Sequence, residues 1–291
     1  MKLIRLYLLG YKGFKVLNGL TQCEIQSIRD VVIARDKNII NDYSSEIESF
    51  CKTHNINCYY RNSESFVNVD YSILIGWRWL IKENNDKLIV IHDSLLPRLR
   101  GFNPLVTALI NGDEIIGATA LLATSQFDKG PIILQESLRI EYPIKINKAT
   151  EYMSDLYLSM VKTLLHKIKN DTITLTEQDE SKATYSLWRD DDDYWIDWTW
   201  NAQKIKRFID AVGYPYLGAK STVNGKLIRI FEVDIVNDDV IIENRTPGKV
   251  LFKDDIGLTV VCGSGLLKIK QLYMDNYEFF DFTNNFRLKF K

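Results

Sequence analysis

The segment L-I-V-I-H-D-S-L-L-P-R-L-R-G, residues 88–101, decides the fold. Its apolar start predicts a buried strand from Leu88 to His92, and the proline-containing turn that follows presents the imidazole at the strand end. A second sharp turn is predicted in Q-F-D-K-G-P, where Asp128 follows His92 by 36 residues. An imidazole and a carboxylate beside turns are what a proton-transfer site needs, so His92 and Asp128 are the predicted catalytic residues.

The residues before this segment predict an α/β fold. Four further strand-like runs cover Leu3 to Leu9, Val31 to Ala34, Cys58 to Tyr60 and Ser72 to Ile75, with a helix-like segment at Tyr43 to Lys52. Strands that alternate with helices favour a parallel sheet. In such sheets ligands bind outside the carboxyl ends of the strands, which is where His92 falls.

The residues after this segment complete a first domain that is predicted to span residues 1–185. They predict a helix from Pro104 to Asn111, capped by Asn103, and strands at Ile115 to Thr124 and Ile132 to Ile140. The loop between these two strands carries Asp128, so two loops from separate strands are expected to converge. An apolar stripe with i, i+3, i+4 spacing predicts a helix over Thr150 to Lys169 that closes the domain.

The second predicted domain, residues 186–291, has a different pattern. A short helix is predicted at Lys204 to Val212, and brief β-rich runs separated by glycine, asparagine and aspartate turns follow it. These runs lie at Leu227 to Val233, Val240 to Ile242, Lys249 to Phe252, Leu258 to Val261 and Leu266 to Ile269. The pattern predicts a small all-β unit.

Composition excludes several classes of protein. The 37 basic residues are balanced by 38 acidic ones, a formal net charge of -1, so the chain has no global positive field to attract a nucleic acid. No apolar run is long enough to cross a bilayer, and the first residues lack a cleavage site of the secretory type. The four cysteines form no C-x-x-C pair or zinc-ligand spacing. A reduced, cytoplasmic setting without a cysteine-held metal is therefore predicted.

The motifs now on the page resemble the folate-dependent formyltransferases, which include methionyl-tRNA formyltransferase and the sugar N-formyltransferases. The resemblance is carried by H-x-S-L-L-P-x-x-x-G at 92–101, G-A-T at 117–119 and D-x-G at 128–130. It extends to I-D-W at 196–198, A-V-G-Y-P-Y-L-G-A at 211–219 and N-G-K-L-I-R-I at 224–230. Residues before about position 70 match only in their rhythm of strands and helices.

The resemblance implies a parallel, Rossmann-like catalytic domain followed by a small β-barrel-like domain. It also implies transfer of a formyl group from 10-formyltetrahydrofolate to a primary amine, without a metal. His92 would take a proton from the attacking amine, and Asp128 would orient His92 and help hold the carrier and a proton-relay water.

Val90 departs from the family pattern, which has N-x-H where this chain has Val90-Ile91-His92. The family's asparagine helps to polarise the formyl carbonyl, and a valine side chain cannot donate a hydrogen bond. Ser94, Asn103 and Gln126 are candidate replacements. Because loss of one such donor costs ~10²- to 10³-fold in rate, a family member that binds folate or a nucleotide sugar without turnover remains an alternative.

The resemblance also indicates two sets of binding residues. The folate set is Trp77, Arg78, Trp79, Leu80, Ser125 and Asp128, in which the indole rings supply flat apolar area, although core packing explains at least one of them equally well. The acceptor set is Ser94, Arg98, Arg100, Gly101 and Asn103, in which the arginines are candidates to hold a phosphate through forked donors.

Three other features have simpler interpretations. The G-Y-K-G turn at 10–13 lacks the third glycine and acidic partner of a dinucleotide site. Asp190 to Asp193 is interpreted as a solvated turn rather than a metal cluster. The dense aromatic residues between Trp188 and Trp200 are expected mainly to pack the domains together.

The predicted acceptor is a nucleotide-linked amino sugar. A transfer-RNA substrate calls for a broad cationic surface, which the net charge argues against, although transfer RNA and a free small amine remain alternatives. The C-terminal β unit is a candidate for a homodimer interface or for an accessory nucleotide-sugar platform.

Overall fold

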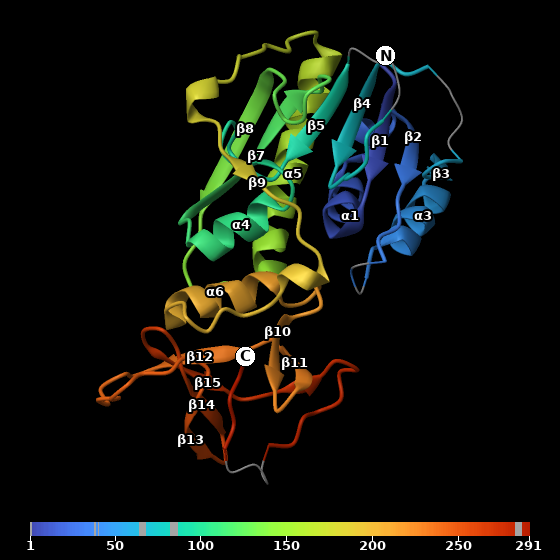
Figure 1. Cartoon of the computed structure of the whole chain (residues 1–291). Coiled ribbons are helices and arrows are strands. Elements are labelled where there is room, and N and C mark those ends of the chain that lie inside the picture. Colours follow the sequence, from blue (N-terminus) through green and yellow to red (C-terminus); the bar gives the residue numbers. More distant parts are fainter. Residues whose placement is uncertain (1, 38, 40, 64–67, 82–86, 283–286) are drawn as a thin grey trace. The chain divides into compact units, whose positions relative to one another are not determined.

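The apolar runs of the first 140 residues form one seven-stranded sheet (Figure 1). The chain is described by a computed structural model, which covers residues 2–37, 39, 41–63, 68–81, 87–282 and 287–291. The strand order in the sheet is β3-β2-β1-β4-β5-β7-β8. These strands are β1 (Ile4–Leu8), β2 (Ile28–Ile33), β3 (Asn57–Tyr60), β4 (Tyr71–Ile75), β5 (Leu88–His92), β7 (Ile115–Leu122) and β8 (Ile132–Arg139).

The predicted parallel, Rossmann-like sheet is confirmed, and it has an antiparallel edge that the sequence did not predict. Strands β1 to β5 pair in parallel, whereas β7 runs antiparallel to β5 and β8 runs antiparallel to β7. A short loop joins β7 and β8, and a short connection can only reverse the chain direction. The sheet is therefore dominated by parallel pairing, with an antiparallel edge.

Helices alternate with the strands along the sequence. They are α1 (Gly10–Gly19), α2 (Gln22–Ile25), α3 (Ser44–Thr53), α4 (Pro104–Asn111) and α5 (Ile146–Lys169). The G-Y-K-G segment, expected to be a turn, is instead the first turn of α1. Leu158 of α5 lies against Gly19, which brings α5 beside α1. In the described part of the chain, no helix has the length and apolar character needed to cross a membrane.

A buried ion pair ties the first two strands of the sheet together. Arg5 on β1 donates to both carboxylate oxygens of Asp30 on β2, at 2.6 and 2.9 Å. Both side chains are almost fully buried, and the carboxylate raises the pKa of Arg5 above its usual value. Such a pair keeps its charges only because each is matched by the other.

The contacts divide the chain into two compact units. The first contains residues 1–105, 115–140 and 148–188, and the second contains residues 106–114, 141–147 and 189–291. The chain therefore passes from one unit to the other more than once. Most of α4 and the segment before α5 belong to the same unit as the C-terminal residues.

The second unit consists of a helix and two small antiparallel sheets. The helix is α6 (Ala202–Val212), and the sheet orders are β10-β11-β16 and β12-β15-β14-β13. The strands are β10 (Ala219–Val223), β11 (Lys226–Ile230), β12 (Val233–Val236), β13 (Val250–Asp254), β14 (Gly257–Val261), β15 (Leu266–Ile269) and β16 (Tyr273–Met274). The predicted run Leu227 to Val233 is divided between β11 and β12, and Val240 to Ile242 is not a strand.

Asp191 gives the acidic run at 190–193 a structural role. Its carboxylate accepts hydrogen bonds from Arg229, at 2.5 and 3.0 Å, and from Lys220, at 3.1 Å. The Arg229 guanidinium and the Lys220 ammonium lower the pKa of Asp191. Among the aromatic residues nearby, Tyr194 and Trp198 are buried and Trp200 is half-buried, whereas Trp188 and Trp195 are exposed.

Candidate functional site

His92 is the last residue of β5, a strand with neighbours on both sides. The strand pairs with β4 and β7, so the imidazole starts from an ordered position in the sheet. Only 8% of the residue is exposed. A base in such a place has a fixed position and little exposure to solvent, so it can be held within reach of a reacting group.

The hydrogen bonds of His92 determine which ring nitrogen is basic. Nε2 lies 2.8 Å from the carbonyl oxygen of Leu99. Because a carbonyl oxygen can only accept, Nε2 must carry a hydrogen and donate it. In the neutral ring the lone pair is therefore on Nδ1, which lies 3.6 Å from Asp128 Oδ1. That separation is too long for a direct hydrogen bond and leaves Nδ1 able to accept a proton.

The carboxylate of Asp128 is held by the backbone of the 92–101 segment. Asp128 Oδ2 accepts a hydrogen bond from the amide of Gly101 at 2.8 Å, and the side chain is 14% exposed. Gly101 has φ +97, and a Cβ atom there would lie 2.5 Å from the carbonyl oxygen of Ser186. Only glycine fits this position. The placement of the amide that bonds Asp128 therefore depends on a glycine at residue 101.

The loop that carries Asp128 follows an unexpected path. Because β7 is antiparallel to β5, the loop leaves the sheet beside the start of β5, where the Ala123 amide donates to the Leu88 carbonyl oxygen at 2.7 Å. It then returns along β5 to His92. The two loops converge as the sequence predicts, and they bring Asp128 Oδ1 to 3.6 Å from His92 Nδ1.

Gln178 fixes this loop from a position about fifty residues away in the sequence. Its amide donates to the carbonyl oxygens of Asp128 and Gly130, at 2.7 and 2.8 Å. The Arg100 guanidinium in turn donates to the Gln178 side-chain oxygen and to the carboxylate of Glu180. Arg100 is fully buried, so the prediction that it holds a substrate phosphate is wrong. Its positive charge is used in these structural contacts with Gln178 and Glu180.

The other predicted acceptor residues lie around the same turn. Ser94 is buried and its hydroxyl donates to the Arg98 carbonyl oxygen at 2.7 Å, which is a local turn bond. The Arg98 side chain is exposed, and Asn103 has a left-handed backbone with φ +49 immediately before α4. The turn also contains β6 (Arg100–Gly101), which pairs with β9 (Tyr185–Ser186).

Val90 and Trp77 meet in an apolar cluster next to His92. Val90 lies two residues before His92, on the same face of β5, and packs with Trp77 against Tyr7 and Leu74. Trp77 makes an edge contact with Tyr7, at 5.0 Å between ring centroids. The Trp77 indole nitrogen is buried, and none of the described residues accepts a hydrogen bond from it. This buried donor fits a flat ligand with a polar edge, such as a pterin.

Of the remaining predicted folate residues, Trp79 is half-buried, whereas Arg78, Leu80 and Ser125 are exposed. Trp79 contacts Trp77 edge-on at 5.3 Å and has the Arg61 guanidinium over its ring. Arg78 pairs with Asp36 at 2.6 Å. Leu80 is 77% exposed, and Ser125 is exposed on the β7–β8 loop.

Sequence reasoning missed Gln178 and a charged group beside His92. Asp93 immediately follows His92, and its carboxylate accepts from Lys12 on α1 and from Tyr157 on α5. The only local signal was that H-D-S places a second titratable side chain next to the predicted base. Nothing in the sequence pairs Lys12 with Asp93, because 81 residues separate them.

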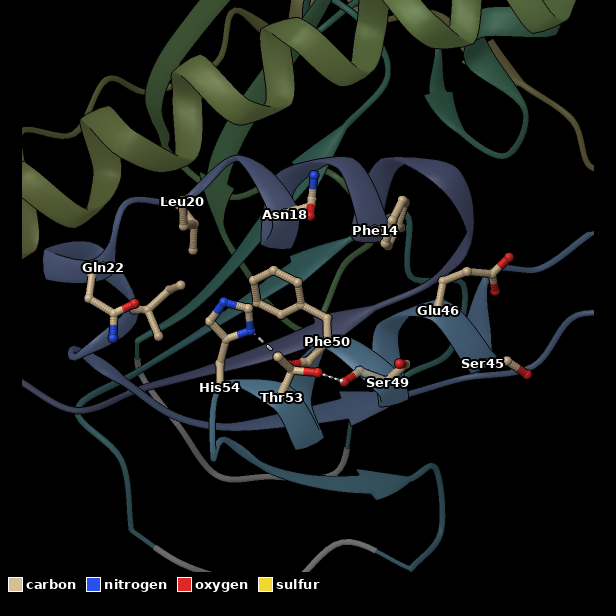
Figure 2. A pocket seen from close by; sticks show the side chains of 11 residues that line it. Phe14, Asn18, Leu20, Gln22, Ser45, Glu46, Ser49, Phe50, Thr53 and His54 are labelled. Atoms are coloured by element: carbon tan, nitrogen blue, oxygen red, sulfur yellow. Dashed lines mark hydrogen bonds between the residues drawn. The ribbon is translucent and has the colours of Figure 1, made fainter.

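A separate cavity of about 640 Å³ lies between α1, α2 and α3 (Figure 2). Phe50 and His54 stack on its wall with ring centroids 3.9 Å apart. None of the predicted site residues is among the residues that line this cavity. The part of the chain that the structure describes holds no group of three or more His, Cys, Asp or Glu side chains suited to a metal ion.

Two protein-family profiles match the chain. The profile described as Formyl transferase matches residues 21–156, which contain His92 and Asp128. The profile described as Formyl transferase, C-terminal domain matches residues 189–287. The chain belongs to the formyl transferase family. The second profile begins where the second unit resumes, at residue 189.

Relatives by sequence are methionyl-tRNA formyltransferases. The protein of that name from Thermotoga neapolitana is 33% identical over 184 residues, which are 63% of this chain and 57% of the relative. The protein from Geobacter metallireducens is 29% identical over 187 residues, 64% of this chain and 58% of the relative. The aligned part thus spans less than three fifths of each relative.

A solved structure of similar fold matches nearly end to end. The N-formyltransferase from Helicobacter canadensis, in complex with folinic acid and dTDP-3-aminofucose, has a TM-score of 0.70 and 17% identity, and the match covers 94% of this chain and all of that one. At this level of identity the match shows that the formyl transferase fold extends through both units of the chain.

Proposed function

We propose that this protein transfers a formyl group from 10-formyltetrahydrofolate to the primary amine of a nucleotide-linked amino sugar. The observation that carries the proposal is the His92–Asp128 pair, with Nε2 of the imidazole committed to the Leu99 carbonyl and Nδ1 facing the carboxylate at 3.6 Å. A base with a defined tautomer beside an anion is suited to remove a proton from an attacking amine.

The roles of the residues follow from the charges that develop. As the amine nitrogen bonds to the formyl carbon, one of its protons passes to His92 Nδ1. The imidazolium that results lies beside the Asp128 carboxylate, which stabilises it. The same proton can then go to the nitrogen of the carrier as its bond to the formyl carbon breaks. The products are a formamide and tetrahydrofolate, and the enzyme returns to its starting state.

The apolar cluster around Trp77 is the proposed place for the pterin. The buried indole nitrogen would donate to the ligand, and Tyr7 and Val90 would supply flat apolar contacts. Because Val90 occupies the position of the family's asparagine, the formyl oxygen would take its hydrogen bond from another donor, of which Asn103 and Gln126 are the candidates. A water held by Asp128 would complete this role.

Two observations bear on the acceptor. The fold match to a protein bound to dTDP-3-aminofucose covers nearly the whole of both chains. The net charge of -1 also suits a small anionic substrate better than a large polyanion. Initiator transfer RNA is the second candidate, because the sequence relatives are methionyl-tRNA formyltransferases.

The test is incubation with 10-formyltetrahydrofolate and a panel of nucleotide-linked amino sugars, with methionyl-tRNA as a parallel acceptor. Mass spectrometry should detect a gain of one formyl group on an amino sugar. The His92→Asn variant should lose turnover by ~10²- to 10⁴-fold, because the base is removed. His166→Asn is the matched control, since His166 is exposed and bonds only with Asn170 among the described residues.

Three outcomes would contradict parts of the proposal. Formylation of methionyl-tRNA alone would replace the amino sugar as acceptor. Folate binding without turnover on any amine would identify a binding protein, as the substitution of valine at position 90 allows. Equal activity of His92→Asn and His166→Asn would remove His92 from the chemistry.

A further inference from the structure

The strongest unassigned feature is a set of three polar side chains behind the imidazole, which we call the Lys12 network: Lys12, Asp93 and Tyr157. The Lys12 ammonium and the Tyr157 hydroxyl both contact the carboxylate of Asp93, the latter at 2.7 Å. The side chains of Lys12 and Asp93 are 13% and 20% exposed, and Tyr157 is buried. Polar side chains from α1, from α5 and from the segment after β5 therefore meet at the Asp93 carboxylate.

The network is attached to the strand that carries His92. The Tyr157 hydroxyl also lies 2.8 Å from the Ile91 carbonyl oxygen, so its single hydrogen serves either that oxygen or Asp93. The hydroxyl of this one tyrosine of α5 thus lies within hydrogen-bond distance of the residues on both sides of His92. Lys12, from the first turns of α1, adds a third anchor to the same end of β5.

The charges of the network cancel. Burial disfavours the ionised carboxylate, but the Lys12 ammonium, helped by the Tyr157 hydroxyl and by His92, lowers the pKa of Asp93 below its usual value. Burial, together with the adjacent Asp93 charge, raises the pKa of Tyr157 well above its usual value, so the phenol is neutral near pH 7. Lys12 and Asp93 therefore contribute one positive and one negative charge beside the imidazole, with a sum of zero.

The charged groups around His92 can be assigned element by element. Asp128 faces Nδ1 from the β7–β8 loop, and Asp93 follows His92 on its own segment. Lys12 comes from α1 and neutral Tyr157 from α5. In the turn at 94–101, the Arg100 guanidinium forms an ion pair with Glu180. With the Lys12–Asp93 pair neutral, Asp128 is the one uncompensated charge in this set.

We infer that Lys12 and Asp93 are positioning residues, whose paired charges hold the end of β5 and balance the field at His92, leaving Asp128 to determine how strongly the imidazole holds a proton. The inference uses the proposed function only in giving that proton a part in the reaction. It also gives a role to the G-Y-K-G segment that the site left unexplained.

The test is a titration of the histidine side chains by NMR, which needs no substrate. The chain has three histidines, and loss of one signal in His92→Asn assigns the resonance of interest. Asp93→Asn removes an anion and leaves the Lys12 cation unbalanced, so the His92 pKa should fall by about one unit. Lys12→Met should raise it while Asp93 stays ionised. The double variant should return close to the wild-type value.

Matched controls separate charge from structure. Lys15→Met removes a lysine from the same helix, where Lys15 pairs with Asp155 near the surface, and should leave the His92 titration unchanged. Lys12→Arg keeps the charge and should behave like the wild type. Tyr157→Phe removes a hydroxyl but no charge and should shift His92 far less than Asp93→Asn. The His54 and His166 signals serve as internal references.

The inference is overturned by an Asp93→Asn variant that keeps the wild-type melting temperature and whose His92 pKa lies within about 0.2 units of the wild type. It is also overturned if Lys12→Met and Asp93→Asn shift His92 in the same direction. If Asp93→Asn does not fold, the His92 pKa values of Lys12→Met and Lys12→Arg are compared instead. Equal values in these two variants would overturn the inference. Failure here would leave the proposed formyl transfer untouched, and absence of formyl transfer would leave this titration unaffected.

Discussion

At the scale of single residues, the candidate site depends on backbone groups as much as on side chains. The Leu99 carbonyl fixes the tautomer of His92, and the Gly101 amide fixes the carboxylate of Asp128. Both come from the turn that the L-L-P-R-L-R-G sequence makes, in which Leu99 also has a left-handed backbone with φ +59. The turn therefore aligns both members of the pair at once.

Substitution of Gly101 by alanine should damage this alignment. The added Cβ atom would lie 2.5 Å from the Ser186 carbonyl oxygen, so the turn or β9 must move. We expect a loss of at least about 1–3 kcal/mol in the free energy of unfolding, because a strained left-handed residue costs that order and the collision with Ser186 adds to it. Turnover in the formylation assay should fall by at least about tenfold, because ~1.4 kcal/mol in the transition state has that effect.

Gly225→Ala is the matched control for this change. Gly225 has φ +77, but nothing lies within 4 Å of the position of an added Cβ atom. It should therefore show the backbone strain without the collision. Chemical denaturation and turnover should both be measured; if the two variants lose activity equally, the contact with Ser186 does not matter to the site.

At the scale of elements, the parallel strands of the large sheet were predicted from the sequence, whereas its antiparallel edge and the division of the later strands were not. The predicted strand Leu88 to His92 has the observed bounds of β5, because a short apolar run ended by a turn is a local signal. The antiparallel direction of β7 and the two-strand division at Phe231 depend on pairing with distant residues. The bond of Arg100 to Gln178 spans 78 positions, so no local pattern could have shown that Arg100 is buried.

The buried pair between β1 and β2 yields a prediction at this scale. Asp30→Asn would leave the Arg5 guanidinium charged and unmatched in the interior of the sheet. We expect the free energy of unfolding to fall by about 3–5 kcal/mol, the usual effect of breaking a buried ion pair. Chemical denaturation monitored by circular dichroism measures it.

The double variant Arg5→Met, Asp30→Leu removes both charges and should recover much of that loss, because apolar replacements leave nothing unpaired. Asp155→Asn, which disrupts the exposed pair with Lys15, should change stability by less than about 1 kcal/mol. Equal effects of Asp30→Asn and Asp155→Asn would show that burial of the Arg5 pair is not decisive.

At the scale of the whole molecule, the two units are not consecutive pieces of the chain. Residues 106–114 and 141–147 lie between segments of the first unit in the sequence but belong to the second unit. The Arg207 side chain of α6 donates to the Ile110 carbonyl oxygen at 3.0 Å, and Lys145 pairs with Glu232. The predicted division at residue 185 does not include these two segments, because their partners lie far away in the sequence.

A fragment of residues 1–188 should therefore be less stable than the full chain. It would contain Leu109, Ile110 and Ile144, which are buried in the full chain, without the second-unit residues around them. Each such side chain contributes ~1.5–3 kcal/mol when it is fully buried. We expect the fragment to unfold at a lower temperature than the full chain, or to aggregate, in calorimetry.

A shorter fragment that ends at residue 170 offers a comparison, since it lacks Gln178 as well. It should be less stable still, because Gln178 joins the Asp128 loop to Arg100. Cooperative unfolding of the 1–188 fragment at the temperature of the full chain would contradict the assignment of the two segments to the second unit.

The part played by Gln178 matters for anyone who wishes to transplant this site into a related scaffold. Grafting residues 88–101 and 123–131 would transfer the imidazole and the carboxylate. It would not transfer the Gln178 side-chain amide, which donates to two carbonyl oxygens of the loop at 2.7 and 2.8 Å. In a recipient with a different side chain at the position of Gln178, the orientation of the Asp128 carboxylate would not be fixed. The smallest transferable unit therefore has three segments, and the third is the segment after α5 that contains Gln178.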